Sequence, residues 1–193
     1  MKNFSWLLLA GALAAAPAAA QDKGLYAGGS VGQVEYADTC TDLSPISSCK
    51  DHDTGWRAFA GYNFNRNFAL EFGYVDLGEV RAEGTLNGTP AGFVATATGF
   101  DFTALFSFGI TERISGFGRL GAFRIRTDAQ ALFGTGFDTG GETNTGFTYG
   151  AGVGYQLGKI GLRAEWVHYD NVGGVTTGED TMDFYAVGLL WRF

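Results

Sequence analysis

Residues 180–193 alternate strictly between two kinds of side chain, and this alternation constrains the fold more than any other feature. Successive side chains of an extended strand point to opposite faces, so one face collects large apolar and aromatic residues. These are Tyr185, Val187, Leu189, Trp191 and Phe193. The other face carries smaller residues and one charge, Arg192. Large side chains towards lipid and smaller ones towards a narrow lumen are typical of the wall of a membrane-spanning barrel.

A final phenylalanine preceded by apolar or aromatic residues at alternate positions resembles the C-terminal signature of bacterial outer-membrane barrels. The resemblance implies that the barrel assembly machinery reads this end of the chain. The expected assembly signal therefore consists of Tyr185, Val187, Leu189, Trp191 and Phe193.

The beginning of the chain has the pattern of an export signal. A short basic region precedes an apolar core at residues 6–13, and small residues at 17–20 precede Gln21 as a cleavage site. The core is far shorter than the ~20 apolar residues that a membrane helix needs. We expect residues 1–20 to be a cleaved signal peptide and residues 21–193 to form the mature barrel.

Eight segments have strand-like periodicity, and the connections between them alternate in length. The predicted strands are residues 24–36, 54–64, 68–78, 95–109, 113–126, 144–156, 160–170 and 180–193. Long connections at 37–53, 79–94, 127–143 and 171–179 alternate with short ones at 65–67, 110–112 and 157–159. This order predicts an all-β fold, an eight-stranded antiparallel up-and-down transmembrane β-barrel with long loops outside and short turns in the periplasm.

The composition fits this fold and argues against one class of partner. The chain has 31 glycines among its 193 residues, and 15% of its residues are aromatic. Soluble domains contain less glycine on average, roughly 7%. The formal charge of -7 disfavours a nucleic-acid partner, because neutralising phosphates needs clustered Lys and Arg. Two cysteines in an exported chain fit an oxidising compartment.

Three further segments resemble the OmpA/OmpX-type family of small outer-membrane barrels. They are LYAGGSVG at 25–32, FAGYNF at 59–64 and ALEFGYVD at 69–76. The resemblance implies a place in the outer membrane of a Gram-negative bacterium, in contact with its lipid and lipopolysaccharide. We expect no peptidoglycan-binding domain after the barrel. Ser30 stands where the family's first strand has a lumen lysine, so the family's internal gate is not expected to transfer whole.

Seven charged residues are expected to face the lumen and to pair there. They are Arg57, Glu71, Asp101, Arg119, Arg163, Glu165 and Arg192. An eight-stranded barrel is just wide enough for side chains to fill it, and buried charges must pair. We place Glu71, Arg163 and Arg192 towards the periplasm, Arg119 and Glu165 in the middle, and Arg57 and Asp101 nearer the outer mouth. This set forms either a salt-bridged plug or a gated polar conduit.

The motifs that suggest catalysis fit structural roles better. Residues 116–121 match G-x-G-x-x-G, but they lie in a predicted strand with no following helix. His168 has no serine on its own or the neighbouring predicted strands, and in residues 51–53 (DHD) a lone histidine stands among loop acids, where it is usually just solvated. The sequence predicts no enzyme, no catalytic residue, no cofactor and no metal site.

A structural or surface-interaction role, adhesion-like or antigen-like, is the function that this sequence favours. The connection 127–143 is acidic through Asp128, Asp138 and Glu142, which suits contact with another cell or bridging to lipopolysaccharide through divalent cations. No extracellular ligand is identified by these residues. The alternatives are a narrow gated pore for small solutes or ions and, third, a lipid-modifying enzyme.

Cys40 and Cys49 are predicted to form a disulfide within the connection 37–53. Both lie in one exported segment, with Pro45 favouring a turn between them. Closing a loop of about ten residues stabilises by roughly 2.5–3 kcal/mol. Thiol labelling of the assembled, non-reduced protein should leave both cysteines unmodified, and labelling of both would contradict the pairing.

Overall fold

The chain forms a closed, all-antiparallel β-barrel in a computed structural model that describes residues 23–36, 46–50, 52–86, 89–133, 136–174 and 178–193. Its strands are β1 (Gly24–Tyr36), β2 (Ile46–Lys50), β3 (His52–Asn63), β4 (Phe68–Leu86), β5 (Thr89–Gly109), β6 (Ile114–Phe133), β7 (Gly136–Leu157), β8 (Ile160–Gly174) and β9 (Gly178–Arg192). No helix within these residues is long and apolar enough to cross a membrane.

The wall closes because the first and last strands of the chain pair with each other. β1 lies between β3 and β9, and Tyr26 is opposite both Gly61 and Arg192. β4 pairs with β3 on one side and with β5 on the other, which completes the ring. The short β2 pairs with the outer end of β4, beyond β3. The predicted eight-stranded barrel is therefore confirmed, with β2 as an addition to its rim.

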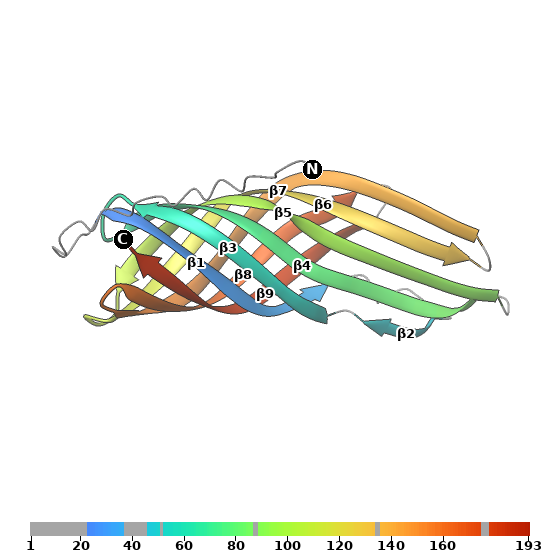
Figure 1. Cartoon of the computed structure of the whole chain (residues 1–193), viewed down its shortest axis with the longest axis horizontal. Helices are drawn as coiled ribbons and strands as arrows, with labels where there is room; N and C mark the ends of the chain where they lie inside the picture. Colours follow the sequence, from blue (N-terminus) through green and yellow to red (C-terminus); the bar gives the residue numbers. More distant parts are fainter. Residues whose placement is uncertain (1–22, 37–45, 51, 87–88, 134–135, 175–177) are drawn as a thin grey trace, which may run out of the picture.

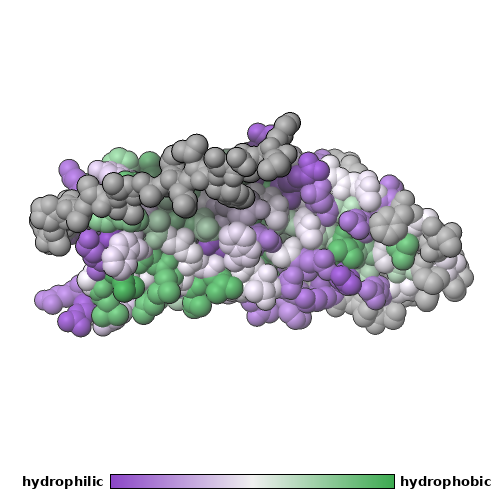
Figure 2. Space-filling model, viewed as in Figure 1, coloured by the Kyte–Doolittle hydropathy of each residue, from purple (hydrophilic) through white to green (hydrophobic). Residues whose placement is uncertain are grey.

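A belt of large apolar side chains covers the outside of the wall. The alternation of residues 185–193 is present as predicted, and Val187 is 63% exposed. The same outward alternation on β5 exposes Phe100, Phe102, Phe106 and Phe108. The rings of Phe72 and Phe100 stack across neighbouring strands at 5.5 Å. Figure 2 shows hydrophobic side chains gathered over the half of the barrel that carries the short turns, as contact with lipid requires.

The three short turns lie at one end of the barrel, next to the C-terminus (Figure 1). In the first turn, the side-chain oxygen of Asn65 accepts hydrogen bonds from the backbone N–H groups of Asn67 and Phe68, each at 2.8 Å. In the second, Thr111 Oγ1 accepts one from the N–H of Ile114 at 3.0 Å. In the third, Gly158 has a φ of 59°, a conformation that glycine adopts without strain.

The opposite end of the barrel differs from the sequence-based expectation. Residues 79–94 and 127–143 were expected to be loops, but most of them continue the strands of two long hairpins. Leu86 still pairs with Thr89, and Phe133 with Gly136. These hairpins, β4–β5 and β6–β7, project beyond the rest of the wall (Figure 1). Besides the backbone pairing, buried Val80 and Ala129 join the hairpins to the apolar cluster at the outer end of the lumen, and Phe93 packs against that cluster.

Candidate functional site

The centre of the lumen holds a layer of buried ion pairs around Arg57. Its Nε and Nη2 donate to Asp101 at 2.8 and 2.6 Å, and its Nη1 donates to Glu71 Oε2 at 3.0 Å. Glu71 also accepts hydrogen bonds from Arg163 Nη2 at 2.7 Å and from the Tyr26 hydroxyl at 2.9 Å. Glu71 and Arg57 are almost wholly buried, so each depends on its partners to compensate for lost hydration.

Arg119 extends the same layer to the opposite side of the barrel. It donates to Glu165 Oε2 at 3.0 Å and to Thr103 Oγ1 at 3.3 Å, and its Nη2 lies 3.5 Å from Asp101 Oδ2. Glu165 is bound less completely than Glu71, since its Oε1 has no hydrogen-bond partner among the described residues. Six of the seven expected lumen charges thus form one connected layer, and we name these six the ionic layer: Arg57, Glu71, Asp101, Arg119, Arg163 and Glu165.

Apolar side chains pack against the ionic layer from both ends of the lumen. On the side of the short turns lie Tyr26, Phe59, Ala69, Leu105 and Phe117. The guanidinium of Arg163 lies over the rings of Phe59 and Phe117, 4.8 and 4.9 Å from their centroids. On the outer side is a larger cluster that includes Val34, Val75, Leu77, Phe123, Ile125, Val167, Tyr169 and Phe184. The two clusters separate the ion pairs from both mouths of the barrel.

Glycines on neighbouring strands make room for the large lumen side chains. A Cβ added at Gly73 would lie 2.7 Å from Nε of Arg57. One added at Gly152 would lie 2.5 Å from the Phe117 ring, and both distances are below ordinary contact. Inward glycines therefore let a narrow barrel hold arginines and aromatic rings.

Arg192 does not join the ionic layer. Its side chain is exposed and makes no ion pair with any described residue. It lines a small cavity of about 60 Å³ at the turn end of the lumen, together with Tyr26 and Arg163. The alternation predicted its face correctly, and its position at the last residue of β9 places it at the mouth of the lumen.

Arg57 and Asp101, which were expected nearer the outer mouth, lie within the ionic layer. Asp101 is the member of this pair that contacts the outer apolar cluster, through Tyr169. Sequence reasoning also missed the hydroxyls that complete the layer. The Tyr169 hydroxyl donates to Asp101 Oδ2 at 3.1 Å, and Thr103 and Tyr26 make the contacts given above. Each of these residues is at an inward position of its strand, so the alternation itself was a usable signal.

The other motifs found in the sequence take structural positions. Residues 116–121 lie inside β6. His168 Nδ1 and Trp166 Nε1 both lie 2.8 Å from Asp183 Oδ1, and Tyr149 stacks on His168, so this group links β7, β8 and β9 on the outer face. Among the described residues, no group of His, Cys, Asp or Glu is arranged to hold a metal ion.

Asp53, outside the apolar belt, also has structural partners. It pairs with Lys50 at 2.7 Å and accepts the backbone N–H of Glu79 at 2.8 Å. Burial alone raises the pKa of this carboxyl, but the hydrogen bonds from Lys50 and Glu79 outweigh it and hold the pKa below its usual value. Asp51, Cys40, the side chain of Cys49 and residues 1–20 lie outside what the structure describes, so the disulfide and the signal peptide stay predictions.

A closed antiparallel wall, a lipid-facing apolar belt and a filled lumen define an integral membrane β-barrel. The chain matches the model of the OmpA-like transmembrane domain over residues 20–193 and therefore belongs to that family. It is an outer-membrane protein of the Gram-negative type.

Curated relatives and solved structures agree with this assignment. Outer membrane protein A of Yersinia pseudotuberculosis is 27% identical over 96% of this chain, and that of Klebsiella aerogenes is 30% identical over 96%. The chain spans about half of each relative's length, 53% in both cases. The attachment invasion locus protein Ail of Yersinia pestis has a TM-score of 0.55 at 16% identity, covering 88% of this chain and 99% of Ail. Neisserial surface protein A has a TM-score of 0.54 at 17% sequence identity, and the match covers 90% of this chain and 100% of that protein.

Removing Glu71 should destabilise the barrel strongly. Glu71→Ala leaves Arg163 without its close carboxylate and Arg57 with Asp101 as its remaining partner, and breaking a buried pair in this way costs about 3–5 kcal/mol. Glu165→Ala should cost less, because Glu165 makes fewer hydrogen bonds. Denaturant unfolding in detergent micelles measures both changes.

The matched control is Glu79→Ala. Glu79 forms an exposed pair with Arg81 at 2.7 Å, and such pairs contribute about 0–1 kcal/mol. Equal stability of Glu71→Ala and Glu79→Ala would refute a structural role for the ionic layer.

Proposed function

We propose that this protein is a non-enzymatic outer-membrane barrel that interacts with other molecules at the cell surface. The observation that supports this most strongly is the projection of the β4–β5 and β6–β7 hairpins from a barrel whose lumen is filled. Because the lumen is filled with side chains, other macromolecules can contact the protein only at its outer surface. The projecting hairpins present a large, ordered part of that surface.

The filled lumen argues against the alternative of a narrow gated pore. An ion crossing the barrel would meet two apolar clusters and a paired ionic layer between them. Opening this path would require breaking buried ion pairs, which costs several kcal/mol. Planar-bilayer recordings test the alternative, and we expect no single-channel steps from the intact protein.

The third alternative, a lipid-modifying enzyme, has little support from the residues around His168. Asp183 orients this histidine, but β7, β8 and β9 contain no serine to act as a nucleophile. Ser30 is buried in the lumen, away from lipid. Mass spectrometry of lipid A from cells with and without the protein would reveal any modification.

The ligand of a similar fold is not expected to fit this surface. Ail has been crystallised with sucrose octasulfate, an analogue of heparin, and this ligand is strongly anionic. The projecting part of β7 in the present chain carries Asp138 and Glu142, and residues 136–147 contain no Lys or Arg. Electrostatic complementarity therefore favours a neutral or cationic partner.

Shortening the β6–β7 hairpin should abolish surface interaction and leave the barrel intact. Replacing residues 129–140 by a two-residue Asn-Gly turn keeps the pairing of the membrane-embedded parts of β6 and β7. Cells that carry this variant should retain normal amounts of folded barrel but lose attachment to host cells and to one another. Attachment equal to that of the intact protein would contradict a surface role for the hairpin.

We also propose that the outward face of β9 serves as an assembly signal for the barrel insertion machinery. Phe193→Ala removes a half-exposed ring that contributes roughly 1.5–3 kcal/mol of burial in lipid. The variant should refold in micelles but accumulate in the periplasm of cells. Phe64→Ala is the control, because Phe64 has similar exposure but lies in the short turn after β3 and not at the end of β9. Equal insertion of both variants in cells would exclude a special role for β9.

A further inference from the structure

The turn end of the lumen carries a positive charge that the ionic layer does not balance. The layer itself is neutral, because its three arginines are matched by its three carboxylates. Arg192 on β9 adds a further positive charge next to this layer, and it forms no ion pair with any described residue. A charge in this position is stabilised by any anion that can come close to it.

The unbalanced charge borders the small cavity described above. Its volume of about 60 Å³ is room for roughly four water molecules. Among the residues that line it there is no Asp or Glu. Its charged and polar lining residues include Arg192, Arg163, Asn63, Ser107 and Ser115. Guanidinium, amide and hydroxyl groups can all donate hydrogen bonds, so the wall of the cavity is rich in donors.

Arg163 brings a buried guanidinium with an unused donor to this cavity. Its Nη2 donates to Glu71 at 2.7 Å, but its Nη1 has no hydrogen-bond partner among the described residues and lies 3.9 Å from Glu165 Oε2. A buried donor without an acceptor is unfavourable. Arg163 and Arg192 also repel each other, so an acceptor with a negative charge at the cavity stabilises both side chains.

Hydrogen bonds fix the rim of the cavity before any ligand arrives. The backbone N–H of Arg192 donates to the carbonyl of Lys159 at 2.9 Å. Gln156 Nε2 donates to the carbonyls of Gly158 and Ile160 at 2.6 and 3.2 Å. The third turn therefore holds the backbone that carries the Arg192 side chain. A preformed site loses less conformational entropy on binding than a flexible one.

A glycine on β7 provides part of the space. Gly154 is opposite Ser115 on β6 and Arg163 on β8. A Cβ added at Gly154 would lie 3.2 Å from Ser115 Oγ, so it would narrow the cavity. On the side of the ionic layer, the rings of Phe59 and Phe117 pack against Arg163 and close the lumen. A ligand therefore enters from the mouth at the turn end.

The wall of the cavity selects a small oxyanion. An arginine fork binds the oxygens of a phosphate or a carboxylate through parallel N–H···O bonds, and neutral donors can bind the remaining oxygens. A metal cation does not fit, because the lining contains two arginines and no carboxylate. The volume excludes a large ligand.

We propose that the cavity at the turn end of the lumen binds a small oxyanion of the size of phosphate, held by Arg192 and Arg163. The bound anion neutralises the unbalanced charge and connects β8 with β9, the last strand of the ring. The site lies at the opposite end of the barrel from the projecting hairpins. The proposal therefore goes beyond the surface-interaction function and does not depend on it.

The test uses the full barrel in a non-ionic, phosphate-free detergent, with inorganic phosphate as the probe. NMR spectra of the ¹⁵N-labelled protein report on the Nε–H groups of Arg192 and Arg163. We expect phosphate to shift both signals in a saturable manner, and sodium chloride at the same ionic strength to leave them in place. Phosphate should also raise the midpoint of denaturant unfolding, because a ligand that binds only the folded state stabilises that state.

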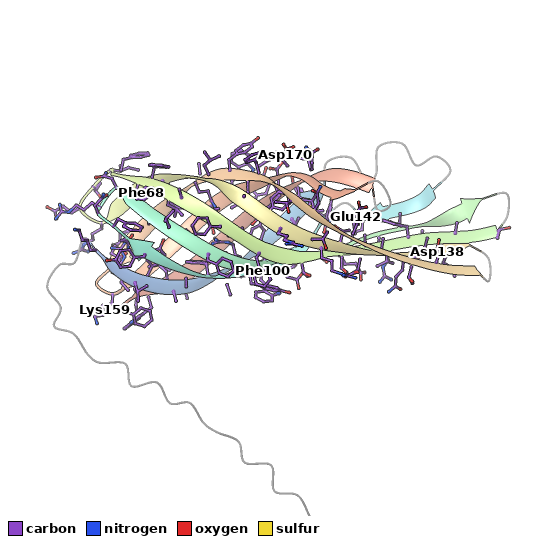
Figure 3. All side chains as sticks on the ribbon, turned by 90° about the horizontal axis from the view of Figure 1, so that it is seen from above. Phe68, Phe100, Asp138, Glu142, Lys159 and Asp170 are labelled. Atoms are coloured by element: carbon purple, nitrogen blue, oxygen red, sulfur yellow. The ribbon has the colours of Figure 1, made fainter. Side chains whose placement is uncertain are left out.

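Three variants locate the site. Arg192→Gln should weaken phosphate binding roughly tenfold or more, since a charge-assisted hydrogen bond contributes at least about 1.4 kcal/mol. Lys159→Gln makes the same charge change at the same end of the barrel (Figure 3), but Lys159 does not line the cavity. It should change the affinity roughly twofold or less. Gly154→Ala keeps every charge and should weaken binding by narrowing the cavity.

A lipid headgroup is a second source of phosphate, and a separate titration distinguishes it. Dihexanoylphosphatidylglycerol, added to the same micelles, carries its phosphate at the membrane surface. If this lipid shifts the Arg192 signal and inorganic phosphate does not, Arg192 contacts headgroups and the cavity site is rejected. Saturable shifts with inorganic phosphate alone support the cavity.

Other results would also overturn the proposal. A wild-type protein whose arginine signals and unfolding midpoint do not respond to phosphate has no such site. Equal effects of Arg192→Gln and Lys159→Gln would show a general attraction of anions to the basic turns. Undiminished binding by a folded Gly154→Ala variant would place the anion outside the cavity.

Discussion

The hydrogen-bonding requirement of the backbone in lipid determines this structure. No water is present in the hydrocarbon core, so every N–H and C=O of the wall must find a partner in the wall itself. The chain meets this requirement by pairing β1 with β9, which leaves no edge within the belt. Lipid-facing residues, inward glycines and the ionic layer all follow from a ring that must close at a small diameter.

The small diameter also explains the unusual contents of the lumen. Six charged side chains lie in a space with little room for water, so they compensate for lost hydration mainly through one another. The compensation is incomplete, because Arg119 Nε, Arg163 Nη1 and Glu165 Oε1 have no hydrogen-bond partner among the described residues. Apolar clusters above and below the ionic layer lower the local dielectric and strengthen those pairs. Charge and apolar packing therefore act together in this barrel, and a polar channel is not needed to explain the arginines.

The sequence predicted the wall well and the projecting hairpins poorly, for a physical reason. Within the belt, lipid imposes a strict alternation of side chains. The alternation of the last strand, applied to each earlier strand in turn, correctly predicted that Phe100 and Val187 face outward. Outside the belt, the face of β6 that points inward carries small residues such as Thr127 and Ala129, which are buried but give only a weak apolar period. The alternation also predicted that Arg192 faces the lumen. It could not predict how far along the barrel axis Arg192 lies, because that position depends on strand tilt and on the packing of neighbours such as Arg163.

The pairing of the first strand with the last has a consequence for how the barrel forms. Tyr26 meets Arg192 only when both β1 and β9 have been made, so the closing contacts join residues far apart in the sequence. Such non-local contacts form slowly, since the chain must lose the entropy of a large loop before they reward it. Until then β1 and β9 are two open edges flanked by lipid-seeking aromatic rings, a state prone to aggregation. A sheet that has not yet closed is therefore the species most prone to aggregate, and pairing of β1 with β9 removes both of its edges.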